Sequence, residues 1–235
     1  MALPLPPLET IMSRLHPGVD EDIAVLENRV AFVQSRQGWR FGIDAVLLAR
    51  HVLAGPQPDA LEIGTGVGVI SILLVSWGYA GTVTAIEIQP TLSDRARSNV
   101  NANGLGDRIR VVSGDVREMD QRLPNLQFGR IFGNPPYFGA HDGRINPHPE
   151  KAAARHELSL DVESLCSVIA RHLAPHGLAS ILYPWSKQFD LCRAASISGL
   201  SVVAQKKALP EDDRAPRVGI FDLVALGEKT VTRPA

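Results

Sequence analysis

The motif Asn134-Pro135-Pro136-Tyr137 combines the residue types that group transfer to a planar nitrogen requires. An amide or aromatic amine nitrogen delocalises its lone pair, so it is a weak nucleophile unless acceptors hold its two N–H groups. The Asn134 side-chain oxygen and the Pro135 carbonyl can be these acceptors, because two prolines fix the backbone around them. Tyr137 offers a ring for a flat substrate. All four are candidate catalytic residues, although a stiff Pro-Pro turn without chemistry is an alternative.

A glycine-rich turn, Glu62-Ile63-Gly64-Thr65-Gly66-Val67-Gly68, stands between a short apolar segment and a longer apolar run. Glycines there let the backbone approach a ligand at the carboxyl edge of a sheet. The spacing alone also fits a bare turn, and a nicotinamide fingerprint would need GxGxxG. Two acids favour adenosine. Glu87 ends the next strand, where it can accept from ribose hydroxyls, and Asp115 follows the third, where it can accept from the adenine amine.

These positions resemble those of class I S-adenosylmethionine methyltransferases over residues 59–137, which implies S-adenosyl-L-methionine as the cofactor. The motif Asn134-Pro135-Pro136-Tyr137 resembles that of amino-group methyltransferases acting on adenine N6, cytosine N4 or glutamine amides, and this chemistry needs no metal. The cofactor-binding residues expected from the turn, the acids and the motif are Glu62, Gly64, Thr65, Gly66, Gly68, Glu87, Ile88, Asp115, Val116 and Asn134.

The apolar segments predict the elements that would position these residues. From residue 60, strand patterns alternate with helix patterns, which indicates a parallel sheet wrapped on both faces. Two final strands joined by a loop indicate an antiparallel hairpin at the sheet edge. The predicted fold is α/β, a doubly wound, mostly parallel seven-stranded sheet of the Rossmann-like methyltransferase type. Its strands are expected at 61–63, 82–88, 108–112, 128–132, 178–183, 201–206 and 218–225, and its helices at 69–77, 91–103, 160–172 and about 188–196.

The residues before this sheet predict a small cap. Two short strands are expected within residues 22–39, and a helix should begin near Asp44 and end at Gly55-Pro56. We therefore expect an N-terminal hairpin-plus-helix cap at residues 1–56, packed on a methyltransferase domain at 57–235.

Two flanking stretches resemble the tRNA1(Val) adenine-N6 methyltransferase family, which modifies the adenine beside the anticodon. They are the run from Arg40 to Ala49, which reads RFGIDAVLLA, and Arg155-His156-Glu157 after the catalytic motif. The resemblance extends from about residue 22 to the final strands. It implies that Phe41 and Asp44 line the cofactor pocket, that Phe138 stands near the substrate, and that the substrate is RNA, with tRNA(Val) the best match.

The stretch from His141 to His156 has no strand pattern but is rich in basic side chains, and an unstructured stretch of about 15 residues is uncommon unless functional or disordered. It could clamp phosphates beside the catalytic turn, and a solvated loop is the alternative. The substrate-binding candidates are Tyr137, Phe138, Arg144, Lys151, Arg155 and His156. Lys206, Lys207, Arg214 and Arg217 could extend a basic rim, although Glu211, Asp212 and Asp213 lie among them. No further aromatic cluster is expected to form an RNA platform.

The composition bounds the remaining possibilities. A net charge of −1 over 235 residues is unusual for an RNA enzyme acting alone, so ribosomal RNA or a release-factor glutamine remain alternative acceptors, and a non-catalytic RNA-binding relic is a third. Neither a secretory signal nor a membrane-length apolar run is visible, and two distant cysteines fit a reducing compartment. We expect a cytoplasmic protein without a membrane partner; the oligomeric state is not predicted.

Overall fold

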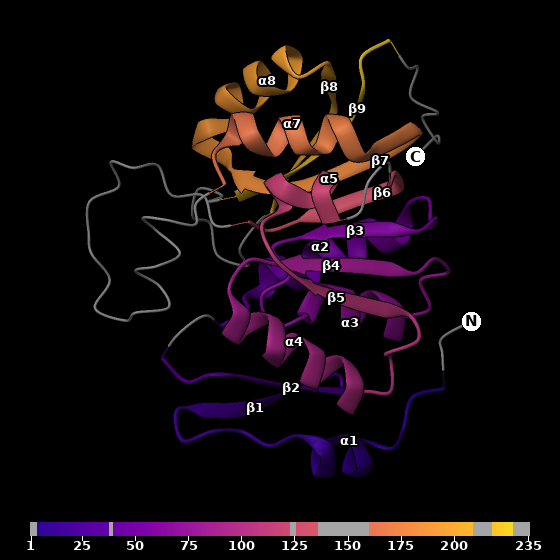
Figure 1. Cartoon of the computed structure of the whole chain (residues 1–235), viewed down its shortest axis with the longest axis vertical. Helices are drawn as coiled ribbons and strands as arrows, with labels where there is room; N and C mark the ends of the chain where they lie inside the picture. The colour runs from indigo at the N-terminus through magenta and orange to yellow at the C-terminus, as the bar shows by residue number, and fades with distance from the viewer. Residues whose placement is uncertain (1–3, 38–39, 123–125, 136–159, 209–217, 228–235) are drawn as a thin grey trace.

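The computed structural model describes residues 4–37, 40–122, 126–135, 160–208 and 218–227. Within them, one seven-stranded sheet has the order β5-β4-β3-β6-β7-β9-β8 (Figure 1). Strands β3 to β7 pair in parallel, and β9 runs antiparallel between β7 and β8. The predicted doubly wound α/β fold with an antiparallel edge is confirmed. The strands are β3 (Ala60–Ile63), β4 (Val83–Glu87), β5 (Ile109–Ser113), β6 (Phe128–Gly133), β7 (Leu173–Pro184), β8 (Leu200–Ala208) and β9 (Val218–Ala225).

Helices cover both faces of this sheet because successive strand residues point to opposite sides. Phe132 packs into the apolar cluster under one set of helices, whereas its neighbour Ile131 packs under the other. The first face carries α2 (Ile43–Ala54), α3 (Val69–Ser76) and α4 (Pro90–Ala102). The second face carries α5 (Met119–Arg122), α7 (Val162–His172) and α8 (Gln188–Ile197). The 3-10 turns η1 (Val116–Glu118) and η2 (Trp185–Lys187) precede α5 and α8.

No helix in the described ranges is long and apolar enough to cross a membrane.

The expected N-terminal hairpin consists of β1 (Glu21–Leu26) and β2 (Val30–Ser35), paired antiparallel. Glu27 and Asn28 both have positive φ, as a type I′ turn requires at its two central residues. A helix that the sequence did not suggest, α1 (Leu8–Arg14), packs on the hairpin. The boundary expected between residues 56 and 57 stays a prediction.

Two asparagines, one in α4 and one at its C-cap, attach the hairpin to the domain. Asn99 and Asn103 are fully buried and lie one helical turn apart, on the face of α4 beside β2. The Val33 N–H donates to the Asn99 Oδ1 at 2.8 Å, and the Asn99 Nδ2 donates to the Val33 carbonyl at 3.0 Å. Asn103 makes the same pair of bonds with Ala31. The two side-chain amides therefore satisfy backbone N–H and carbonyl groups at the outer edge of β2, as a neighbouring strand would.

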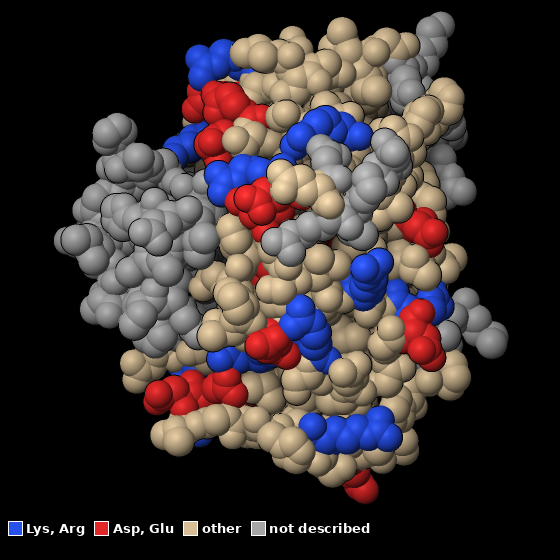
Figure 2. Space-filling model, in the orientation of Figure 1, with Lys and Arg blue, Asp and Glu red and all other residues tan. Residues whose placement is uncertain are grey.

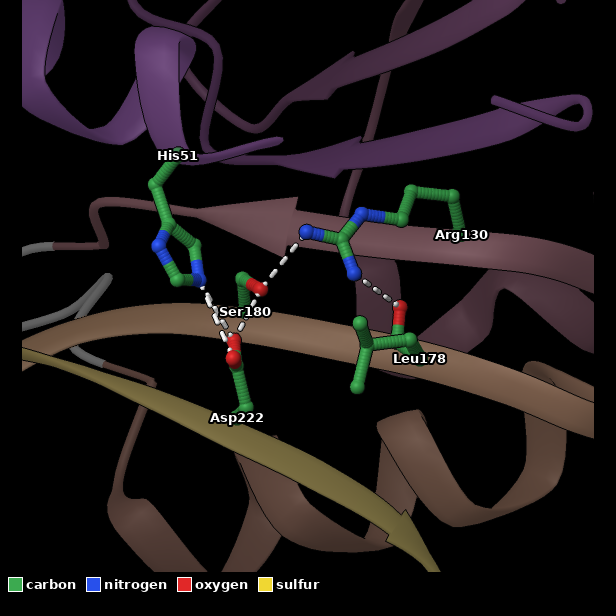
Figure 3. Close-up of polar contacts among 5 residues, drawn as sticks. All are labelled: His51, Arg130, Leu178, Ser180 and Asp222. Carbon is green, nitrogen blue, oxygen red and sulfur yellow. Dashed lines mark hydrogen bonds and ion pairs between the residues drawn. The ribbon is translucent and has the colours of Figure 1, made fainter. Parts of the chain in front are cut away.

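A buried polar network joins α2 to the middle of the sheet (Figure 3). Asp222 on β9 contacts the His51 Nε2 at 2.9 and 3.0 Å and accepts a hydrogen bond from the Ser180 hydroxyl. Ser180 in turn accepts from the Arg130 guanidinium at 2.8 Å. Burial alone would raise the pKa of Asp222, but its bonds with His51 and Ser180 and the charge of Arg130 lower it below its usual range.

Candidate active site

A cleft opens at the carboxyl ends of β3, β4, β5 and β6, where the following loops meet the start of α2. It contains about 1120 Å³ of space, part of which is open to solvent. Strands of a parallel sheet bring the residues that follow them to one edge, which explains why distant segments meet here. Most of the predicted cofactor-binding residues line this cleft, namely Phe41, Gly64, Thr65, Gly66, Glu87, Ile88, Asp115, Val116 and Asn134.

The glycine turn shapes the floor of the cleft. Gly64 and Gly66 have φ values of +71° and +58°, in a backbone region that residues other than glycine rarely adopt. The Gly64 and Thr65 N–H groups donate to the Ile86 carbonyl at 3.0 and 3.1 Å, which ties the turn to β4. A Cβ atom at Gly66 would meet no atom within 4 Å, so the backbone there borders open space. A ligand can thus approach the main chain closely.

Glu87 places a carboxylate on one wall of the cleft. Its Oε2 accepts from the Gly66 N–H at 2.8 Å, and its Oε1 accepts from the Gln89 N–H at 2.9 Å. Burial raises the pKa of Glu87, partly offset by backbone N–H groups that include these two. Each oxygen has a further lone pair, so the carboxylate can still accept hydrogen bonds from a ligand diol.

Asp115 has a partner that the sequence analysis missed. Its carboxylate accepts from the Arg117 N–H at 2.8 Å and from the Arg117 guanidinium at 2.6 to 3.0 Å, and Arg117 also lines the cleft. Partial burial would raise the pKa of Asp115, but these bonds and the positive charge lower it below its usual range. The carboxylate is thus held ionised and oriented. The sequence offered one signal for this pair, since Arg117 stands two residues after Asp115.

The first half of the catalytic motif meets the glycine turn. Asn134 is exposed and Pro135 buried, and both line the cleft directly after β6. A Cβ atom at Gly64 would lie 3.6 Å from the Pro135 Cα, and one at Gly133 would lie 2.6 Å from the Ile63 carbonyl oxygen. These close approaches hold the motif against the end of β3. Pro136 and Tyr137 lie outside the described residues.

Glu62, Gly68 and Asp44 do not line the cleft. Glu62 is fully buried beneath the turn, where it accepts from the Thr65 hydroxyl at 2.7 Å and from the Ser71 hydroxyl. Burial raises its pKa to about 7, although these hydroxyls lower it. Gly68, at φ +90°, begins α3 and packs on Ala96 of α4. Asp44 lies in the first turn of α2, and burial raises its pKa.

The predicted substrate-binding residues Phe138, Arg144, Lys151, Arg155 and His156 also lie outside the described residues, so their roles stay predictions. Besides Arg117, the cleft is lined by residues that the sequence analysis did not single out, and they include Gln89, Leu92 and Leu160.

Comparisons with known proteins agree with this arrangement. The family model described as "Methyltransferase domain" matches residues 60–138. A tRNA1(Val) (adenine(37)-N6)-methyltransferase of Shewanella amazonensis is 31% identical over 180 residues, covering 77% of this chain and 76% of that protein. The protein of the same name from Porphyromonas gingivalis strain W83 is 34% identical over 158 residues, covering 65% of this chain and 61% of that protein.

Solved structures share the fold. TrmN from Thermus thermophilus superposes with a TM-score of 0.57 at 23% identity, over 77% of this chain and 48% of that one. The methyltransferase SMU.776, solved in complex with SAH, gives a TM-score of 0.65 at 14% identity, over 88% of this chain and 56% of that one. Identities this low establish the architecture alone.

Proposed function

The chain belongs to the tRNA1(Val) (adenine(37)-N6)-methyltransferase family, and we propose that it methylates the N6 of an adenine in tRNA(Val), next to the anticodon. The observation that carries this proposal is the contact between Pro135 and Gly64, which sets the catalytic motif beside the cofactor turn in one cleft. An enzyme of this kind works where tRNA is used, so we propose a cytoplasmic location.

The residues of the cleft fit S-adenosyl-L-methionine. Glu87 is a buried carboxylate with free lone pairs for ribose hydroxyls, and Asp115 is an oriented acceptor for the adenine amine. The open space beside Gly66 admits a ligand against the main chain. When bound, the cofactor supplies an electrophilic methyl group.

Asn134 and Pro135 would act on the other reactant. Their side-chain and backbone oxygens accept the two N–H groups of the target amine, which orients the nitrogen lone pair toward the cofactor side of the cleft. This is positioning rather than proton abstraction, and effective positioning is worth several orders of magnitude in rate. Tyr137 is proposed to stack on the adenine.

Replacement of Asn134 tests this function. By calorimetry, we expect Asn134→Ala to keep most of its affinity for S-adenosylmethionine. Its turnover should fall by at least about a hundredfold, typical of a lost preorganised polar contact. Asn101→Ala, on the exposed face of α4, is the matched control and should be fully active. Retained turnover in Asn134→Ala would contradict the proposed role.

The acceptor is tested by incubating the wild type with labelled cofactor and separate pools of tRNA, ribosomal RNA and release factor. Label in tRNA, recovered as N6-methyladenosine, supports the proposal. Label in the release factor alone would replace tRNA by a protein glutamine, and failure to bind the cofactor would indicate a non-catalytic relic.

A further inference from the structure

A second group of side chains lies at the same sheet edge as the catalytic motif, beside the end of β7. Because β6 and β7 are parallel and Gly133 pairs with Ile181, Asn134 leaves β6 level with the last residues of β7. Trp185 follows β7 directly, in η2. At roughly 3.3 Å per residue and 4.8 Å between strands, it lies on the order of 10 Å from Asn134.

The Trp185 ring is held in place by β9. It stacks on Phe221 with ring centroids 5.7 Å apart and an interplanar angle of 28°. A Cβ atom at Gly219 would lie 2.6 Å from the Trp185 Cε3, so the ring covers the one position of this strand segment that lacks a side chain. A fixed aromatic ring that is only partly buried can stack on a nucleobase with little loss of side-chain freedom.

One lysine of β8 borders this ring. Lys207 pairs with Gly219 in the sheet, and its Nζ lies 5.2 Å from the centre of the Trp185 ring. The Lys207 side chain is exposed, whereas Lys206 pairs with Ile220 and so points to the other face of the sheet. Within the part of the chain that the structure describes, Lys207 forms no ion pair with a carboxylate. Its exposed ammonium group can contact a phosphate beside the ring.

An exposed aromatic residue follows on the first turn of α8. Phe189 is 80% exposed, an unusual position for a large apolar ring. The adjacent carboxylate, Asp190, forms an ion pair with Arg193 at 3.5 Å. Aromatic rings beside a lysine are a combination that binds single-stranded nucleic acid, because bases stack on the rings and the ammonium group contacts the backbone.

Resting on the proposed function, we propose that Trp185, Phe189 and Lys207 form a binding platform for the single-stranded nucleotides next to the target adenine. Bases stack on the two rings, and Lys207 contacts an intervening phosphate. The platform orients the strand so that the adenine enters the cleft at Asn134. The sequence indicated a basic rim at Lys206 and Lys207, but the two aromatic residues are brought to it only by the fold.

Steady-state kinetics with an unmodified tRNA(Val) transcript test this proposal. Phe189→Ser should raise the KM for tRNA about tenfold, the scale of one lost stacking contact, while kcat and S-adenosylmethionine affinity stay at wild-type values. Lys207→Gln should raise KM and reduce the slope of log affinity against log salt by about 1. Trp185→Leu should also raise the KM for tRNA about tenfold, and its affinity for S-adenosylmethionine shows whether the variant is folded.

Matched controls come from surfaces away from this edge. Ile197→Ser removes a 76% exposed apolar side chain at the opposite end of α8, and Arg110→Gln removes an exposed charge on β5, the other edge strand. Both should leave the KM for tRNA unchanged. If the wild type methylates the transcript but Phe189→Ser and Lys207→Gln match it in KM and salt slope, the platform is refuted and the function stands. If the wild type leaves the transcript unmethylated, the proposed function fails instead.

Discussion

Replacing Asn99 by leucine should separate the N-terminal hairpin from the domain and loosen the cofactor turn at the same time. The Asn99 side chain is fully buried and bonds three backbone groups. It accepts from the Val33 N–H at 2.8 Å, and its Nδ2 donates to the carbonyls of Val33 and Val67 at 3.0 and 2.9 Å. Val67 belongs to the glycine turn, so one side chain holds β2 and the floor of the cleft.

The expected loss follows from these three bonds. Leucine has the same branching but is larger and has no polar atom, so it leaves three backbone groups without a partner, and a buried unsatisfied group costs about 1–3 kcal/mol. Because solvent can reach part of the β2 edge once the hairpin shifts, we expect the free energy of unfolding to fall by about 3–5 kcal/mol. That is a large share of the roughly 5–15 kcal/mol that stabilises a typical domain.

Urea denaturation followed by circular dichroism measures this loss, and calorimetry measures S-adenosylmethionine binding below the unfolding transition. Asn101→Ala, exposed on the same helix, is the control and should change stability by less than about 0.5 kcal/mol. Cofactor affinity should fall in Asn99→Leu and not in the control. A stability loss below about 1 kcal/mol, with unchanged cofactor affinity, would refute the reasoning.

Three further predictions concern ionisable groups. The Glu62 pKa of about 7 exceeds its ordinary value of 4.5, so the folded state binds the proton more tightly than the unfolded state does. The free energy of unfolding should therefore fall by about 3 kcal/mol as the pH rises from 4.5 to 7. The urea midpoint of Glu62→Gln should not show this fall. The Asp222 pKa is lowered, so its contribution is present above the ordinary value of 3.8 and lost as pH falls through the folded value; Asp222→Asn should be less sensitive to acid in the same assay. Arg117→Gln should weaken S-adenosylmethionine binding several-fold by calorimetry, because Asp115 loses its orienting partner, and equal affinity would contradict that role.

The parts of the site that sequence predicted are those set by position along a strand. Glu87 and Asp115 each stand at or just after the end of a parallel strand, and such positions meet at one edge whatever the details of packing. Glu62 stands two residues before Gly64 and is still inside β3, so strand alternation and the start of α3 decide where its side chain points. It points at Ser71 rather than into the cleft.

The missed features depend on contacts that no local pattern encodes. The strand expected at 178–183 begins earlier in the structure, because β7 continues back through residues 174–177 with a register shift and a positive φ at His176. The pairing of Arg117 with Asp115 requires the η1 turn, for which the sequence has no strong signal. The α1 helix is stabilised by packing on the hairpin, since its seven residues are too few for a stable isolated helix.

The near-neutral charge of the chain and an RNA substrate are compatible once charge is considered locally. On the face drawn in Figure 2, basic and acidic groups are interspersed and no extended field of one sign is visible. The net charge of the chain is −1, so long-range attraction to RNA is weak and binding depends on short-range contacts near the reacting base. Lys207 beside a stacking ring provides such a contact, and the salt dependence should be correspondingly shallow, since each phosphate contact adds only about 0.7–0.9 to the slope. A steep slope, equivalent to six or more phosphate contacts, would require further cations, for which the predicted substrate-binding residues Arg144, Lys151 and Arg155 are the candidates.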